Sequence, residues 1–277
     1  MGAAFRIMGV VNVTPDSFSD GGRFMDPERA VAHALELAAE GADILDVGGE
    51  STRPGAAPVS ERDELRRVLP VIEALAAVGT EAVISVDTSK AAVARAALGA
   101  GARMVNDVSA LRGDPEMAEV VAASGAECCL MHMRGEPRTM QADPRYEDVV
   151  GEVRAFLAER MEAARRAGIA EEQVMLDPGI GFGKTVKHNL TLLAHIGELA
   201  ALGRPILVGT SRKSFLGRLA ADAAGRGEPL PADGRLAGTI TSNVLAFERG
   251  ARVFRVHDVA PVRAALALAD ATLAADA

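Results

Sequence analysis

The stretch VISVDTSKAAVARAALGAGARMVND, residues 83–107, contains the unit that decides the fold. It opens with an apolar, β-branched run (Val83–Asp87), continues as an Ala-rich segment of helical period, and returns to an apolar run at Arg103–Asn106. A short buried strand, a helix and another short strand are typical of βα units around a parallel sheet. The Gly-Ala pair at Gly101 that precedes the second strand recurs at Gly41, Gly125 and Gly250, which indicates one repeated junction.

The same alternation continues along the chain. We expect strands at Arg6–Val13, Asp43–Val47, Val83–Asp87, Arg103–Asn106, Cys128–Met131, Val174–Asp177, Ile206–Gly209 and Arg252–Val256. Ser60 and Asp114 have the side chains that start helices, and Gly79 and Gly168 are placed to end them. Eight units predict an α/β fold, a (β/α)8 TIM barrel, in a single domain of residues 1–277. An open doubly wound sheet is the alternative, and Asp222–Asp233 is expected to be an inserted loop.

Composition excludes several classes of protein. The chain has 277 residues, 49% hydrophobic and 25% charged, which is the range of globular domains. A net charge of −8, 3% aromatic residues and no Trp argue against binding to nucleic acid. The two cysteines, Cys128 and Cys129, are adjacent, which excludes a disulfide framework and favours a reducing compartment. No export signal or apolar run of about 18 residues is present, so we expect a cytoplasmic protein.

Polar residues follow nearly every expected strand. They include Asn12, Thr52, Arg53, Asp87, Asn106, Met131-His132, Asp177, Ser211, Lys213, Arg255 and His257. In a parallel barrel the carboxyl ends of the strands share one mouth, where such enzymes carry out their chemistry. These side chains are therefore predicted to surround a single site.

The predicted mouth is divided by charge. Asp87, Asn106 and Asp177 could accept hydrogen bonds from the planar N–H groups of an aminopyrimidine or a similar heterocycle. Lys213, Arg255 and His257 suit a phosphate or diphosphate, which a chain of net charge −8 would otherwise repel. We therefore expect a ligand with a heterocycle at one end and a phosphate group at the other.

Other motifs do not predict a different chemistry. GIGFGKT at residues 179–185 lacks the first glycine of a Walker A loop and the third glycine of a dinucleotide fingerprint, so we interpret it as a flexible loop. No Ser-His-Asp order, HExxH motif or zinc-ligand cluster is present. His132 either faces the mouth or caps a strand, and the two cysteines are expected to be small apolar fillers.

The motifs resemble those of one enzyme family. NVTPDSFSDGG (12–22), GGESTRPG (48–55), SVDT (85–88), NDVS (106–109), LMHMRGEPRTMQ (130–141), DPGIGFGK (177–184), GTSRKS (209–214) and RVHDV (255–259) occur in this order over the whole chain. In this set the chain resembles the dihydropteroate synthases. The resemblance implies a homodimeric transferase of folate biosynthesis, the target of sulfonamides, which joins p-aminobenzoate to 6-hydroxymethyl-7,8-dihydropterin diphosphate.

The resemblance also assigns roles to residues. Asp87, Asn106 and Asp177 would hold the pterin, with Met131 nearby and Lys213 close to the ring. Arg255, His257 and Asn12 would take the diphosphate, Asn12 through Mg²⁺. Thr52, Pro54, Phe182, Ser211 and Lys213 would border the p-aminobenzoate slot, and Arg53 would lie in a mobile loop that closes over the diphosphate.

Two other functions remain open at this stage. A pterin-dependent methyltransferase would share the Asp and Asn residues but would not need the cationic side of the mouth. A catalytically silent paralogue would bind pterin without condensing it. Ile180 and Arg134 depart from residues frequent in the family, which leaves the shape of the slot and the response to sulfonamides undetermined.

Overall fold

The described residues form a closed barrel of eight parallel strands. The computed structural model describes residues 4–14, 27–51, 56–135 and 139–275. The strands are β1 (Arg6–Asn12), β2 (Ile44–Gly48), β3 (Val83–Asp87), β4 (Met104–Asp107), β5 (Glu127–Met131), β6 (Val174–Asp177), β7 (Ile206–Val208) and β8 (Ala251–Val256). They pair in chain order, and β8 closes the ring on β1 through Met8 and Arg255. The predicted barrel is confirmed, and the open doubly wound sheet is wrong.

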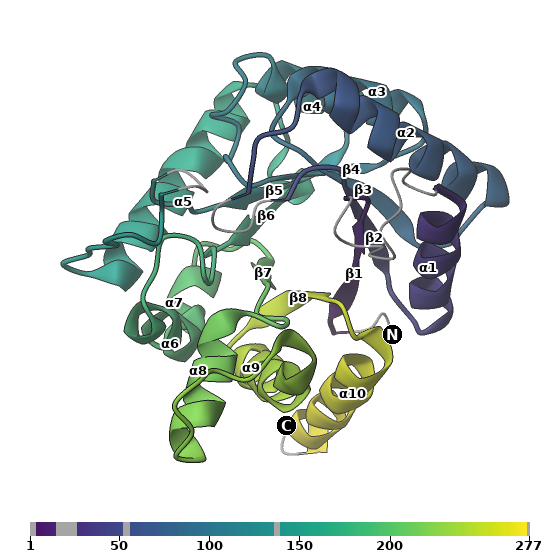
Figure 1. Ribbon diagram of the computed structural model, residues 1–277. Helices are drawn as coiled ribbons and strands as arrows, with labels where there is room; N and C mark the ends of the chain where they lie inside the picture. Colours follow the sequence, from purple (N-terminus) through teal and green to yellow (C-terminus); the bar gives the residue numbers. More distant parts are fainter. Residues whose placement is uncertain (1–3, 15–26, 52–55, 136–138, 276–277) are drawn as a thin grey trace.

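The helices surround the strands (Figure 1). They are α1 (Pro27–Ala39), α2 (Glu61–Val78), α3 (Ala91–Gly99), α4 (Met117–Ser124), α5 (Val149–Arg166), α6 (Val186–Ala194), α7 (Ile196–Ala200), α8 (Ser214–Ala223), α9 (Leu236–Glu248) and α10 (Val259–Ala275). Short 3-10 turns, η2 (Glu171–Gln173) and η3 (Ala232–Arg235), precede β6 and α9. The predicted loop at 222–233 lies between α8 and α9, although its first residues belong to the end of α8 and its last to η3.

Local signals explain where some of the helices begin or end. Ser60 accepts a hydrogen bond from the backbone N–H of Asp63 at 3.1 Å and so caps α2. Gly79 ends the same helix in the left-handed region at φ 71°. Asp114 does not start α4, which begins at Met117. Its carboxylate instead accepts from the first residue of α3, Ala91, at 2.9 Å, and from Glu116 at 3.0 Å.

The core has two layers because side chains alternate across each strand. One set packs outward against the helices and includes Ile7, Val47, Val86, Cys128 and Phe254. A smaller set fills the barrel interior: Met8, Ile44, Met104, Cys129, Met175, Leu207 and Val253. Both cysteines are free and buried, and burial raises the pKa of each thiol. This agrees with the prediction that they fill space.

Candidate active site

The mouth residues are placed by the same alternation that builds the interior. Along each strand, the side chain two positions after an interior residue also points inward, one layer nearer the carboxyl end of the strand. The interior residues from which these positions are counted are Ile44, Met104, Cys129, Met175 and Val253. These second-layer residues are Asp46, Asn106, Met131, Asp177 and Arg255. The strand register therefore brings together residues that lie more than 200 positions apart, as the sequence predicted.

Asp46 lies at the centre of this layer. Its carboxylate accepts hydrogen bonds from Ser85 Oγ at 2.7 Å, Asn106 Nδ2 at 3.0 Å and Arg255 Nε at 2.6 Å. The side chain is fully buried. Asp46 was not predicted as a site residue, although one acidic residue inside the apolar run ILDVG was a signal that could have found it.

Arg255 lies among the acidic residues and not apart from them. Besides Asp46, it donates from Nη2 to Asp87 Oδ2 at 2.9 Å. Burial disfavours the guanidinium charge, but the two carboxylates outweigh this and hold the pKa of Arg255 above its usual range. The predicted division of the mouth into acidic and cationic sides is therefore wrong for Arg255.

Asp87 is a carboxylate poised to change its charge. It is 8% exposed, and burial raises its pKa to about 7, with Arg255 opposing the shift and Asp46 adding to it. A heterocycle that donates hydrogen bonds would favour the ionised form. Proton uptake at this group can thus compete with ligand binding near neutral pH.

Asp177 and Lys213 form a second charged pair in the mouth. Burial raises the pKa of Asp177, and the Lys213 ammonium opposes that shift. Burial also lowers the pKa of Lys213 to about 8. Lys213 Nζ donates to the carbonyl of Ile180 and lies 4.6 Å from the centroid of the Phe182 ring. Phe182, Lys213 and Asp177 are therefore adjacent, as predicted.

The glycine-rich loop after β6 is held firmly, contrary to the prediction of a flexible loop. Lys184 is buried, and its ammonium donates to the carbonyls of Gly179 and Phe182 at 3.0 Å each and contacts His132 Nδ1 at 2.9 Å. Gly179 has φ 66°, and a Cβ there would lie 1.9 Å from the carbonyl oxygen of His132. Only glycine fits this approach.

His132 belongs to this support and not to the mouth. Its backbone N–H donates to the carbonyl of Asp177 at 2.9 Å, and its ring packs edge-on against Phe156. Burial, with Lys184 nearby, lowers the pKa of His132 to about 3. Burial likewise lowers the pKa of Lys184 to about 7. Sequence reasoning left the role of His132 open and missed Lys184.

The remaining predicted residues fall into two groups. Ser211 and His257 contact each other, with Ser211 Oγ 3.0 Å from His257 Nδ1 and accepting from the backbone N–H of His257 at 3.1 Å. Asn12 is half-buried at the carboxyl end of β1, and Met131 is buried at the end of β5. The predicted residues Thr52, Arg53 and Pro54 lie outside the described residues.

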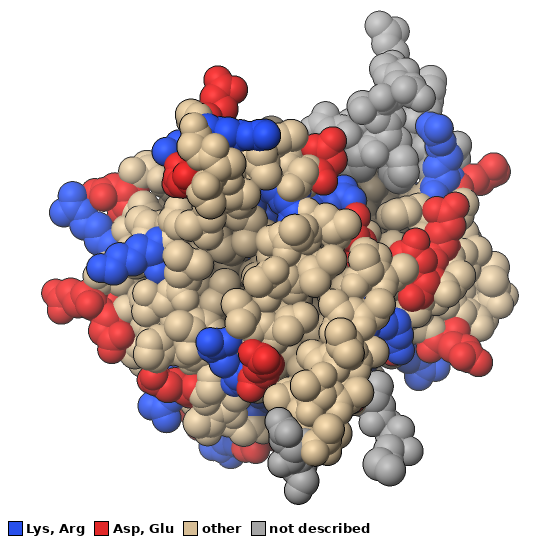
Figure 2. All heavy atoms as spheres, turned by 90° about the horizontal axis from the view of Figure 1, so that it is seen from below, with Lys and Arg blue, Asp and Glu red and all other residues tan. Residues whose placement is uncertain are grey.

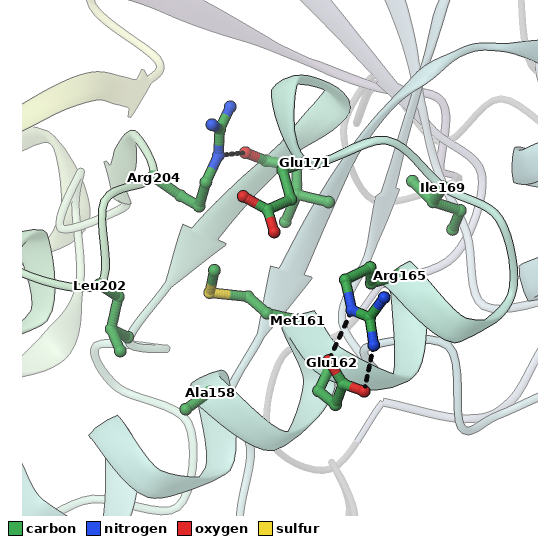
Figure 3. Close-up of a pocket in the computed structure, with 9 residues that line it drawn as sticks. Ala158, Met161, Glu162, Arg165, Ile169, Glu171, Leu202 and Arg204 are labelled. Carbon is green, nitrogen blue, oxygen red and sulfur yellow. Dashed lines mark hydrogen bonds and ion pairs between the residues drawn. The ribbon is translucent and has the colours of Figure 1, made fainter.

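A cavity at the opposite end of the barrel is not this site. It lies where α5 and the loop before β7 meet the start of β6, and Val174 is among its lining residues. Met161, Ile169 and Leu202 supply an apolar wall (Figure 3). Arg165 pairs with Glu162 at 2.8 Å, and Arg204 Nε donates to the carbonyl of Val174 at 3.2 Å. The charged side chains around this cavity are thus largely paired within the protein, and the cavity lies far from the polar layer of the mouth.

The fold and the mouth together define a (β/α)8 barrel with buried carboxylates at the carboxyl ends of its strands. Residues 8–257 match the family described as pterin binding enzyme. The dihydropteroate synthase of Mycobacterium leprae is 52% identical over 259 residues, covering 93% of this chain and 89% of the relative.

Solved structures agree with this match. The Xanthomonas albilineans dihydropteroate synthase with 4-aminobenzoic acid has a TM-score of 0.88 and 51% identity, over 97% of this chain and 93% of the other. The Yersinia pestis dihydropteroate synthase with a sulfonamide drug complex has a TM-score of 0.89 and 45% identity, over 97% and 94%. The chain belongs to the dihydropteroate synthases, the transferases of folate biosynthesis that make 7,8-dihydropteroate.

Proposed function

We propose that the mouth joins p-aminobenzoate to 6-hydroxymethyl-7,8-dihydropterin diphosphate, with Asp87, Asn106 and Asp177 holding the amino-pyrimidine edge of the pterin. The observation that carries this proposal is that the side-chain oxygens of these three residues are buried together at the carboxyl ends of β3, β4 and β6. Such acceptors match the N–H groups of an aminopyrimidine. Met131 would lie beside the ring, and Lys213 close to it.

The diphosphate would be held by Arg255, His257 and Asn12. Arg255 uses Nε and Nη2 on the two aspartates, and within the described residues its Nη1 makes no hydrogen bond, so this edge is available to an anion. His257 stands at the end of β8 beside Ser211. These groups would offset the charge that grows on the leaving diphosphate.

Asn12 is a suitable partner for Mg²⁺ bound to the diphosphate. Its amide supplies a hard oxygen ligand, and the described residues contain no group of three or more His, Cys, Asp or Glu that could hold a metal ion by themselves. A single protein oxygen fits a Mg²⁺ ion that takes its other ligands from phosphate and water. When bound, the ion would neutralise charge on the diphosphate.

The p-aminobenzoate would lie beside Phe182, Ser211 and Lys213. The Phe182 ring, with the Lys213 ammonium over it, would form the apolar part of the wall, and the Ser211 hydroxyl would form the polar part. Thr52 and Pro54, on the segment after β2, would complete the slot, Arg53 would close over the diphosphate, and sulfonamides would compete for the space of p-aminobenzoate. The X. albilineans relative is described with 4-aminobenzoic acid and the Y. pestis relative with a sulfonamide drug, which supports binding of these two classes of compound.

The condensation needs no protein nucleophile. The C–O bond between the pterin methylene and the diphosphate breaks, the arylamine nitrogen forms the new C–N bond, and the amine loses a proton. The dihydropterin ring can carry the developing positive charge, which the carboxylates of Asp87 and Asp177 would stabilise. The protein thus acts by positioning and by electrostatics.

We also propose that the enzyme is a homodimer. Figure 2 shows the face over α8, α9 and α10, where charged side chains lie mainly around the edge. α9 has no charged residue before Glu248, and Leu245 and Leu268 are exposed on α9 and α10. An exposed surface that is poor in charge is typical of a subunit interface. Light scattering on the purified protein tests the stoichiometry.

We propose a single-domain cytoplasmic enzyme. One barrel accounts for all the described elements, and the two buried thiols are free, which suits a reducing compartment. Within the described ranges, none of the helices has the length and hydropathy needed to span a membrane. Fractionation of cells that express the tagged protein tests the location.

Pyrophosphate release is the direct test of the activity. The purified protein is mixed with both substrates and Mg²⁺, and pyrophosphate and dihydropteroate are measured together. We expect both products in equal amounts, and none when p-aminobenzoate or the pterin diphosphate is left out. Pterin binding without release of pyrophosphate would indicate a silent paralogue and refute the proposed activity.

A further inference from the structure

We propose that Asp46 sets the hydrogen-bonding polarity of the pterin site and thereby selects a heterocycle with a donor edge over one with an acceptor edge. The inference rests on the proposed function, because it concerns the same pocket. It assigns to Asp46 the role of a positioning residue that acts through Asn106 and Arg255.

Asp46 lies beneath the binding surface and not on it. Its side chain has no exposed area, whereas Asp87, Asn106 and Asp177 are 8%, 5% and 7% exposed. A ligand in the mouth can therefore reach these three residues but not Asp46. Any influence of Asp46 on a ligand must pass through the groups to which it is bonded.

An ionised carboxylate can only accept hydrogen bonds, so every partner of Asp46 must donate. Ser85 donates to Oδ1, while Asn106 and Arg255 both donate to Oδ2. The distances of 2.6 to 3.0 Å are those of well-formed hydrogen bonds. Asp46 thus accepts from three partners and fixes the direction in which each of them donates.

The consequence is greatest for Asn106, because an amide can present either a donor or an acceptor. With Nδ2 directed at Asp46, the carbonyl oxygen Oδ1 is on the other branch of the amide and accepts no hydrogen bond within the described chain. The opposite rotamer would place Oδ1 about 3 Å from a carboxylate oxygen, which is repulsive in a buried site. Asn106 must therefore offer an acceptor to the ligand.

Asp46 also fixes the guanidinium of Arg255. Nε is bonded to Asp46 and Nη2 to Asp87, so two neighbouring carboxylates hold one side of the planar group. Nη1, which makes no hydrogen bond to the described part of the chain, is thereby held in one direction, in which it can donate to the anionic end of the ligand. The buried carboxylate of Asp46 thus makes Asn106 an acceptor for the heterocycle and orients Arg255 as a donor for the diphosphate.

The test compares two ligands that differ only at positions 1 and 2 of the pyrimidine ring, where donor and acceptor are exchanged. One is 6-hydroxymethylpterin, which carries a donating 2-amino group, and the other is 6-hydroxymethyllumazine, which carries an accepting 2-oxo group. Calorimetric affinities for both are measured with the wild type, D46A and D46E. The ratio of the two dissociation constants reports the selection directly.

We expect the wild type to prefer the pterin strongly. In D46A the acceptor beneath Asn106 is gone, which lets Asn106 rotate and offer its own NH2, so the preference should fall at least tenfold. D46E keeps an acceptor-only group and should keep the preference, although both affinities fall. If D46A does not fold, Asp46→Ser is measured in its place, with the same expected loss of preference.

Asp107→Asn is the matched control. Asp107 is equally buried at the end of β4, but its carboxylate accepts from Ser109 and from the backbone of Leu111. D107N should leave the ratio of affinities unchanged. An unchanged ratio in folded D46A would overturn the role of Asp46, whereas a wild type that binds neither ligand would count against the proposed function itself.

Discussion

Replacing Arg255 with Met should destabilise the protein by leaving two carboxylates without their cation. Arg255 donates to Asp46 at 2.6 Å and to Asp87 at 2.9 Å, and both acids are buried. Methionine fills a similar length with an apolar side chain, so the change removes mainly the charge. The variant also leaves the backbone of β8 unchanged.

The magnitude follows from the burial of the two acids. Removing one partner of a buried ion pair costs about 3–5 kcal/mol, because an uncompensated charge stays in the interior. Ser85 and Asn106 still donate to Asp46 in the variant, which offsets part of the cost. We therefore expect the free energy of unfolding of R255M to be about 3 kcal/mol lower than that of the wild type at pH 7.5.

The destabilisation should depend on pH with a definite sign. Burial already raises the pKa of Asp87 to about 7, and Arg255 opposes that shift, so its loss raises the pKa further. A carboxyl whose pKa is higher in the folded state than in the unfolded state stabilises the fold at low pH, and this contribution is lost as the pH rises towards the folded-state pKa. Below pH 7 Asp87 is protonated in both folded proteins, so the deficit of R255M should be steady there, and it should grow above pH 7 by up to about 1.4 kcal/mol per pH unit.

Urea denaturation followed by far-UV circular dichroism measures this, since the chain has no Trp and one Tyr to report by fluorescence. The double variant R255M/D46N removes the charge of one of the two carboxylates that R255M leaves without a cation, and it should recover part of the stability at pH 7.5. A loss below about 0.5 kcal/mol, or a pH dependence equal to that of the wild type, would refute the ion-pair reasoning.

Three further outcomes are expected. Asp177→Asn should weaken binding of 6-hydroxymethylpterin by about 1.5–3 kcal/mol, the range for a hydrogen bond to a charged group, and an unchanged affinity in calorimetry would contradict the assignment. His257→Ala should slow turnover in the pyrophosphate assay and leave the affinity for the diphosphate-free pterin intact. Equal loss of both would remove His257 from the diphosphate side. Because burial raises the pKa of Asp87 to about 7, wild-type affinity for the pterin should fall about tenfold per pH unit below pH 7, and Asp87→Asn should abolish this dependence.

The fold could be predicted from the sequence because its signals are local. Apolar runs of strand length alternate with helical segments, several of which end at a Gly-Ala junction. This pattern places the strands to within about one residue, and the predicted bounds of Val83–Asp87 and Val174–Asp177 agree with the structure at both ends. The predicted start of α4 was wrong. Asp114 has the right side chain for a cap, but its carboxylate accepts a hydrogen bond from the backbone N–H of Ala91 in the preceding helix. A capping residue shows only that some helix begins near it in space.

The contents of the mouth were predictable, but their pairing was not. Parallel strands buried on both faces give a nearly continuous apolar pattern, which does not show which residues point into the barrel. Asp46 and Arg255 are 209 positions apart, and they meet only because β8 closes the ring on β1, next to β2. Sorting the residues by charge therefore placed Arg255 with the cations, whereas in a buried layer a cation is most stable next to the acids. Arg255 is paired with Asp46 and Asp87, so binding of an anion to Arg255 must use the edge that the two aspartates leave open.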